Sequence, residues 1–117
     1  DIRASIYSKY PTLVNEKQLK IIKNVIKNIR EDLSEKNIEY YPILHSTYPE
    51  VKNKWNYNTY ERLAPMFEKL YMPEYELSKI NQLYFKGDGH NNINGNKKIS
   101  NFITQIIRKS INEKNTD

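Results

Sequence analysis

The chain has 117 residues, enough for one domain, and carries a formal net charge of +5 at pH 7. Because it has no cysteine, disulfides and thiolate metal sites are excluded. Its 19 basic and 14 acidic residues are interspersed, which makes nucleic-acid binding a minor alternative, and no apolar run approaches the roughly 18 residues that a transmembrane helix needs.

The first predicted element is a helix that begins after Asn15. Residues 1–14 show no clear period, whereas Asn15 is a favourable N-cap and is followed three residues later by Gln18, the pattern of a capping box. The helix is predicted to end at residues 36–37. One apolar stripe repeats along it at steps of three and four: Leu19, Ile22, Ile26, Ile29 and Leu33.

A short buried strand is predicted next, at residues 38–46. The run is apolar and aromatic and directly follows the helix, as in the second half of a βαβ unit, although Pro42 disfavours a regular strand. His45 then lies at the C-terminal end of this strand, the edge at which open α/β sheets bind their ligands. Residues 47–58 are predicted to form a loop rich in aromatic side chains.

Three further elements complete the chain. A second helix is predicted over residues 59–70, with Pro65 distorting it or lying in its first turn, and a short strand over residues 75–77. A closing helix begins near Gly95, and residues 112–117 are expected to be a frayed tail. The apolar stripe of the closing helix consists of Ile99, Phe102, Ile103, Ile106, Ile107 and Ile111.

This alternation of helices and strands predicts an α/β fold with a parallel sheet. Two strands do not make a stable parallel sheet, because such a sheet needs several neighbouring strands and cover on both faces. We therefore expect residues 1–117 to form a single but partial domain, whose sheet is completed by strands outside this chain.

All three glycines of the chain lie in the stretch LYFKGDGHNNING, around Asp88 and His90. A carboxylate bonded to Nδ1 of an imidazole fixes the tautomer of the ring and stabilises its protonated form, so that Nε2 can act as a general base. Gly87 and Gly89 give the backbone the freedom to bring the two side chains together, and Gly95 lets the chain turn into the closing helix. The alternative is an ordinary solvent loop, in which Asp, Asn and Gly are all common.

The same stretch resembles the last sequence block of the SGNH (GDSL-like) hydrolase superfamily. In that block an aromatic pair precedes Asp-x-His, and Asn and then Gly follow at the start of the final helix. The matching positions are Tyr84, Phe85, Asp88, His90, Asn92 and Gly95. Alginate O-acetyltransferase-like relatives often have Trp after the His, where this chain has Asn91. The order of predicted elements over residues 15–111 is also similar to the C-terminal half of such domains, which implies part of a three-layer α/β/α, flavodoxin-like domain.

What the resemblance implies for function is a serine ester hydrolase, either an esterase or a lipase, or an O-acyltransferase. A serine attacks the acyl carbonyl, His90 acts first as base and then as acid, and Asp88 orients His90. The supporting residues of the motif are Asn92, Gly95, Gly87 and Gly89. The resemblance implies no cofactor and no metal.

The family takes its nucleophile from a Gly-Asp-Ser block, and this chain contains no such block. Ser5 and Ser8 lie near the beginning of the chain without that context. We therefore expect the serine to come from the N-terminal half of the same domain or from a separate chain, and this chain alone to be inactive. The expected substrate is a small ester or an acylated carbohydrate or lipid.

Other functions remain open at this point. The motif can be a structural clamp in a non-catalytic binding or interaction module, and the net charge of +5 is compatible with a basic nucleic-acid-binding domain. A calcium loop is disfavoured, because Gly95 stands at position eight counted from Asp88 instead of position six, and no Glu closes the loop. The compartment stays open, with a secreted or cell-envelope location favoured by the resemblance.

Individual side chains also have two interpretations. His45 can line an active site or be structural. Four aromatic side chains of the middle of the chain can form a platform for a sugar or an acyl chain, or they can pack into the protein. They are Tyr48, Trp55, Tyr57 and Tyr60.

Overall fold

The computed structural model describes residues 15–116, so the interpretations of residues 1–14, including Ser5 and Ser8, lie outside it. Of the described residues, 65% are helical and 4% take part in β bridges, and they form no sheet. The predicted α/β fold with a parallel sheet, as the C-terminal part of a three-layer flavodoxin-like domain, is therefore wrong. The elements are α2 (Glu16–Glu35), α3 (Tyr48–Lys52), α4 (Trp55–Leu63), the 3₁₀ helices η1 (Ala64–Met66) and η2 (Leu77–Gln82), and α5 (Ile93–Asn115).

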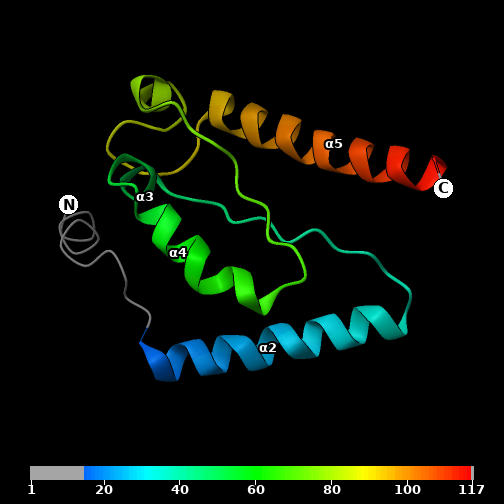
Figure 1. Cartoon of the computed structure of the whole chain (residues 1–117). Coiled ribbons are helices and arrows are strands. Elements are labelled where there is room, and N and C mark those ends of the chain that lie inside the picture. Colours follow the sequence, from blue (N-terminus) through cyan, green and yellow to red (C-terminus); the bar gives the residue numbers. More distant parts are fainter. Residues whose placement is uncertain (1–14, 117) are drawn as a thin grey trace.

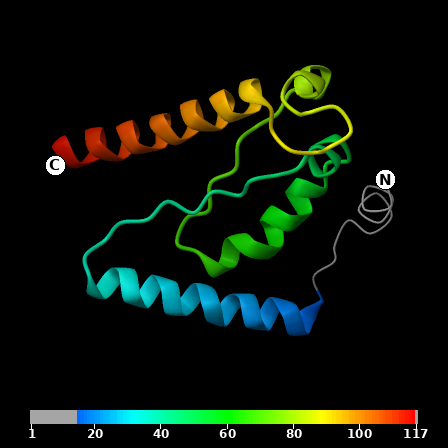
Figure 2. The ribbon, with the colours of Figure 1, turned by 180° about the vertical axis from the view of Figure 1, so that it is seen from behind.

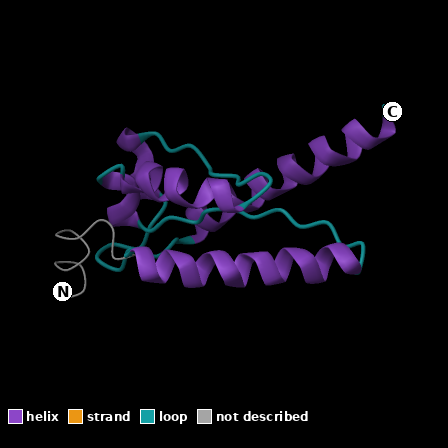
Figure 3. Cartoon of the chain, turned by 60° about the horizontal axis from the view of Figure 1, so that its bottom comes forward, coloured by secondary structure: helices purple, strands orange, loops and turns teal. Residues whose placement is uncertain are grey.

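The two long helices lie on opposite sides of the molecule. In Figure 1, α2 runs along one side and α5 along the other, with α4 and two extended segments between them. Figure 2 shows the same arrangement from behind, and Figure 3 shows helices and loops without a strand among the described residues. The radius of gyration is 16.2 Å, compared with about 13 Å for a compact domain of this length. The described part of the chain is therefore loosely packed.

The predicted first helix is confirmed as α2. The Asn15 side chain accepts a hydrogen bond from the Gln18 backbone N–H, and the Gln18 side chain accepts one from the Asn15 N–H, both at 2.9 Å. This capping box satisfies two backbone donors that a helix start otherwise leaves unpaired. The predicted apolar stripe is only partly covered, because no residue of α2 is buried. Its most exposed apolar side chains are Ile21, Val25 and Ile29.

The predicted strand over residues 38–46 is wrong. This segment is extended but makes only one isolated parallel bridge, between Ile43 and Tyr71. The Leu44 N–H donates to the Tyr71 carbonyl at 2.8 Å, and the Tyr71 N–H donates to the Pro42 carbonyl at 2.9 Å. Because proline has no N–H, it cannot extend this ladder from its own backbone. Within residues 15–116 the pairing therefore stops at a bridge.

Both boundaries of the middle helix were also predicted incorrectly. The expected loop over residues 47–58 contains α3 and the beginning of α4, and the expected helix over residues 59–70 ends early. Thr47 begins α3, because its backbone N–H and its hydroxyl both donate to the Glu50 carboxylate, at 3.1 and 2.7 Å. At the other end, Pro65 lies in η1, and the backbone is extended at Phe67.

The predicted strand over residues 75–77 is wrong as well, because Leu77 begins the 3₁₀ helix η2. This helix contributes Ile80 to a small core with Val51 of α3 and with Tyr84. Three half-buried side chains pack around that core: Tyr48, Tyr75 and Leu83. Through Leu83 and Tyr84, the core thus adjoins the segment that carries Asp88 and His90.

The predicted closing helix is confirmed as α5, which runs on through residues 112–115, where we expect fraying from the sequence. Its C-terminal half contacts the segment after α2. The Tyr41 and Ser110 hydroxyls share a hydrogen bond of 2.7 Å, and Lys114 forms an ion pair with Glu39. The ion pair lowers the pKa of Glu39 through its hydrogen bond to Lys114 and raises the pKa of Lys114 for the same reason. These contacts attach the C-terminal half of α5 to the extended segment that follows α2.

Candidate active site

The candidate site is built on a tight hairpin between η2 and α5. Tyr84 and Asn91 form an antiparallel bridge, the Phe85 N–H donates to the His90 carbonyl at 2.9 Å, and the Asn92 N–H donates to the Leu83 carbonyl at 3.0 Å. The turn between these residues needs two left-handed backbone positions. Gly87 and Gly89 supply them, with φ angles of 79° and 81°. The chain can therefore reverse within a few residues.

The hairpin brings Asp88 and His90 together. The Asp88 carboxylate contacts Nδ1 of His90. Both side chains face solvent, with 77% of the His90 side chain and 55% of the Asp88 side chain exposed. Among residues 15–116 no hydrogen bond to Nε2 of His90 is found. The geometry thus places a carboxylate on one imidazole nitrogen and leaves the other accessible.

Asn92 connects this hairpin to the closing helix. Its side-chain oxygen accepts from the Gly95 N–H at 3.0 Å and caps α5. Its amide nitrogen donates to the Gln82 carbonyl at 2.9 Å and to the Tyr84 carbonyl at 3.3 Å. The Asn92 side chain therefore joins the first arm of the hairpin to the start of α5, and it does not contact the Asp88/His90 pair through any of these bonds.

Gly95 is buried where the first turn of α5 crosses the hairpin. A Cβ atom at this position would lie 2.1 Å from the Leu83 carbonyl oxygen and 2.9 Å from the Asn91 side chain. The absence of a side chain, and not an unusual φ angle, is what this position requires. The sequence-based interpretation of Gly95 as a freely turning residue is thus replaced by close backbone contact.

His45 also lies beside the hairpin. Its Nε2 atom is 3.0 Å from the amide nitrogen of Asn91. The same segment makes two further contacts: the Tyr48 N–H donates to the Gly89 carbonyl at 3.1 Å, and the Tyr84 hydroxyl donates to the Ser46 carbonyl at 3.0 Å. His45 and Asp88/His90 are therefore brought into one neighbourhood, although the predicted strand end is not there. Sequence reasoning gave no role to Asn91 or Ser46.

Three tyrosines, Tyr84 and the half-buried Tyr48 and Tyr75, pack beside the hairpin. Tyr84 is buried, and its ring packs edge-on against Tyr48 with 5.6 Å between ring centroids. The Tyr75 hydroxyl is buried and has no hydrogen-bond partner among the described residues. Burial raises the pKa of both Tyr75 and Tyr84 above the usual value.

We expect the protein to lose stability as the pH rises above about 10, the pKa of tyrosine in an unfolded chain. A pKa raised in the folded state favours the neutral phenol, so this stabilisation is complete below the unfolded pKa and is lost as the pH increases. Urea unfolding of wild type, Tyr75→Phe and the exposed control Tyr57→Phe between about pH 8 and pH 11 measures it. Tyr75→Phe should show the smallest loss; an equal loss in all three proteins contradicts the assignment.

Two of the four aromatic residues considered as a platform make contacts within the protein. Tyr48 belongs to the packing around the core, and the Tyr60 hydroxyl donates to the Leu70 carbonyl at 3.2 Å. Trp55 is half-buried, while Tyr57 is exposed. The structure favours the packing interpretation for Tyr48 and Tyr60.

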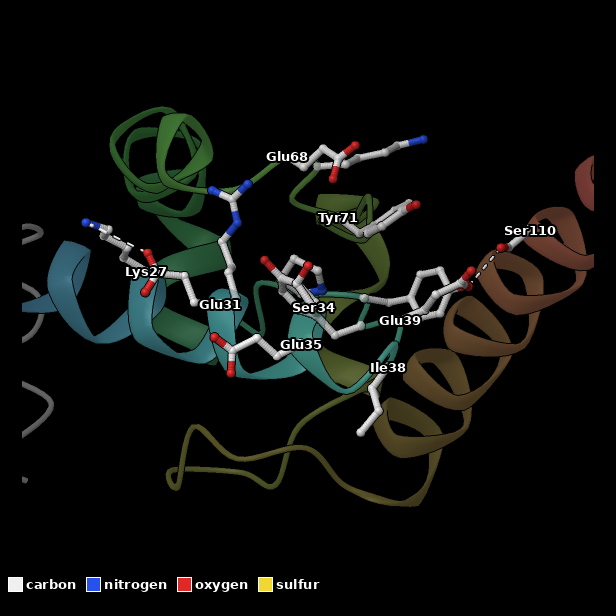
Figure 4. Close-up of a pocket in the computed structure, with 14 residues that line it drawn as sticks. Lys27, Glu31, Ser34, Glu35, Ile38, Glu39, Glu68, Tyr71 and Ser110 are labelled. Carbon is white, nitrogen blue, oxygen red and sulfur yellow. Dashed lines mark hydrogen bonds and ion pairs between the residues drawn. The ribbon is translucent and has the colours of Figure 1, made fainter.

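A cavity of about 920 Å³ lies elsewhere, between α2, the segment after it, residues 68–71 and α5. Figure 4 shows side chains of both charges around it, among them Glu35, Glu68 and Lys27, with Tyr71 in its wall. Asp88, His90 and His45 do not line it. The cavity is therefore separate from the candidate active site.

The part of the chain from residue 15 to residue 116 contains no group of three or more His, Asp or Glu side chains that could hold a metal ion. No helix in that part is long and apolar enough to cross a membrane. No family model, no curated protein and no solved structure matches the chain.

Proposed function

We propose that this chain supplies the histidine and the aspartate of a serine-dependent ester hydrolase or O-acyltransferase. The observation that carries the proposal is the contact of the Asp88 carboxylate with Nδ1 of His90 on an exposed hairpin. The resemblance of residues 83–95 to the last block of the SGNH hydrolases agrees with it. The nucleophilic serine, in this proposal, belongs to polypeptide other than these 117 residues.

The chemistry follows from the two nitrogens of His90. Nε2 takes the proton of the serine hydroxyl as the serine oxygen attacks the acyl carbonyl, and Asp88 stabilises the resulting imidazolium through Nδ1–H. The imidazolium then returns the proton to the leaving alcohol, which leaves an acyl-serine. Water or an acceptor hydroxyl repeats the sequence with His90 again as base, which separates hydrolase from transferase.

The exposure of the pair supports a site completed by a second surface. A histidine whose side chain is 77% exposed can be approached by a serine from another polypeptide without rearrangement of the hairpin. Water exclusion, which strengthens the electrostatic contribution of Asp88, would then come from that same surface. The substrate class that we propose is a small ester or an acylated carbohydrate or lipid.

The test is covalent labelling with a fluorophosphonate, whose phosphorus is attacked by an activated serine with loss of fluoride. The full protein that contains this sequence, with any chain that copurifies, is labelled and the modified peptide is identified by mass spectrometry. We expect one labelled serine outside residues 1–117, and labelling below detection in His90→Ala.

The matched control is Lys86→Ala, because Lys86 is exposed in the same hairpin and neither of the two side chains depends on it. This variant should be labelled like wild type. Absence of a labelled serine in wild type, or unchanged labelling in His90→Ala, contradicts the proposal and favours a non-catalytic module in which the motif only joins the hairpin to α5.

A further inference from the structure

We infer that His45 is a positioning residue for the Asp88/His90 pair and acts through Asn91; this inference rests on the proposed function. Three observations carry it: the bond from His45 to Asn91, the attachment of Gly89 to the same segment, and the exposure of the His90 ring. None of them follows from the resemblance, which assigns no residue to position 45.

The first observation is the side-chain bond itself. Nε2 of His45 lies 3.0 Å from Nδ2 of Asn91, and an amide nitrogen can only donate, so the ring nitrogen accepts. This bond corresponds to the His45 tautomer that carries its proton on Nδ1. Asn91 directly follows His90 and forms the bridge to Tyr84, so its side chain is tied at the base of the hairpin. The bond holds the residue next to His90 on one side.

The second observation is a backbone contact on the other side of His90. The Tyr48 N–H donates to the Gly89 carbonyl at 3.1 Å, and a Cβ atom at Gly89 would lie 3.6 Å from Cδ of Pro49. Gly89 separates Asp88 from His90. Residues 45–48 therefore hold the chain immediately before and immediately after His90, and the side chain of His45 is one of these two attachments.

The third observation explains why such attachments matter. The side chain of His90 is 77% exposed, and its ring bonds to Asp88 in the described chain, so packing does little to restrain it. Its orientation depends on where its backbone stands relative to Asp88. A hairpin with left-handed positions at Gly87 and Gly89 can shift easily, because glycine has the widest choice of conformations. Loss of the bond at Asn91 removes the side-chain attachment on the C-terminal side of His90 and leaves the backbone bonds of the hairpin to hold it.

A positioning role predicts a spectroscopic change at His90, which a merely structural role for His45 does not. The experiment is a long-range proton–nitrogen correlation spectrum of the imidazoles, recorded on the full chain at about pH 8.5, where a free histidine is neutral. In wild type we expect His90 mostly with the proton on Nδ1, facing Asp88. In His45→Ala we expect a shift toward the mixture of tautomers of a free imidazole.

His45→Gln is the conservative variant and should restore the wild-type spectrum, because a glutamine amide both donates and accepts hydrogen bonds at a similar reach. Asn91→Ala removes the same bond from the other side and should reproduce the shift of His45→Ala. Urea unfolding of all variants controls for global destabilisation, and we expect midpoints close to wild type for both variants of the exposed His45.

An unchanged His90 spectrum in both His45→Ala and Asn91→Ala overturns the inference. So does a wild-type His90 without a preferred tautomer. Fluorophosphonate labelling of the same proteins distinguishes a failure of the proposed function from a failure of this inference. The absence of a labelled serine in wild type contradicts the proposed function, whereas the imidazole spectra test the role of His45 without requiring a serine. If both hold, labelling of His45→Ala should be slower than wild type, and His45→Gln should recover most of the rate.

Discussion

Replacing Asp88 with asparagine is expected to slow serine labelling by about 10⁴-fold, the loss that follows when the acid of a Ser-His-Asp triad is replaced by its amide. The carboxylate only accepts hydrogen bonds, so its contact with Nδ1 requires the proton to be on that nitrogen. An asparagine amide can instead donate to Nδ1, which moves the ring proton to Nε2. A protonated Nε2 cannot take the proton of serine.

We expect the free energy of unfolding to change little in Asp88→Asn, because more than half of the Asp88 side chain is exposed. The rate constant of fluorophosphonate labelling is measured under pseudo-first-order conditions for wild type, Asp88→Asn and the hairpin control Lys86→Ala. Unfolding midpoints of the three proteins should agree. A rate for Asp88→Asn within tenfold of wild type means that Asp88 does not orient the base, even if His90 is required.

The solvent exposure of Asp88 and His90 weakens the electrostatic interaction between them. At 4 Å two unit charges interact with only about 1 kcal/mol in water, and several times more where water is excluded. With 55% of its side chain in water, Asp88 stabilises an imidazolium weakly in this chain alone. Under the proposed function, the surface that brings the serine also excludes water and lowers the local dielectric constant. The nucleophile and the stronger effect of Asp88 on the imidazolium are then both supplied by the same surface.

Features with a local cause could be predicted from the sequence. Asn15 and Gln18 mark the start of α2 because a capping box involves only residues three apart. The Asp88/His90 contact was expected for a similar reason, since glycines on both sides of Asp88 allow the backbone to curl within a few residues. In each case the partners are close in sequence, so the residue types alone specify the geometry.

Features with a non-local cause could not be predicted. A short apolar run such as residues 38–46 becomes a strand only when neighbouring segments pair with it, and here a single bridge to Tyr71 is present. Thr47 and Glu50 form a capping box, which is a local signal for a helix start, but the segment was predicted to be a loop because of its many aromatic residues. Contacts across many residues, such as His45 with Asn91, leave no periodic trace in the sequence.

Replacing Gly95 with alanine is expected to destabilise the protein by about 2–3 kcal/mol, even though alanine is the better helix former by about 1 kcal/mol. The new methyl group would stand 2.1 Å from the Leu83 carbonyl oxygen and 2.9 Å from Cγ of Asn91. The Leu83 carbonyl cannot simply withdraw, because it accepts the hydrogen bond of the Asn92 N–H. Either α5 moves away from the hairpin or that bond breaks.

Two controls separate this crowding from other effects of the substitution. Gly87→Ala adds a methyl group with nothing within 4 Å, so its cost is the left-handed backbone alone, about 1–2 kcal/mol. Ser100→Ala tests a substitution to alanine at an exposed position of α5 and should be neutral or slightly stabilising. Urea unfolding followed by circular dichroism gives the three free energies.

The expected order of stability is Ser100→Ala, Gly87→Ala and then Gly95→Ala. A Gly95→Ala protein as stable as wild type would falsify the close contact of α5 with the hairpin. Crowding at Gly95 also displaces Asn91, whose side chain bonds His45. The folded fraction of Gly95→Ala should therefore label more slowly than the folded fraction of Gly87→Ala, because the attachment beside His90 is lost together with the helix start.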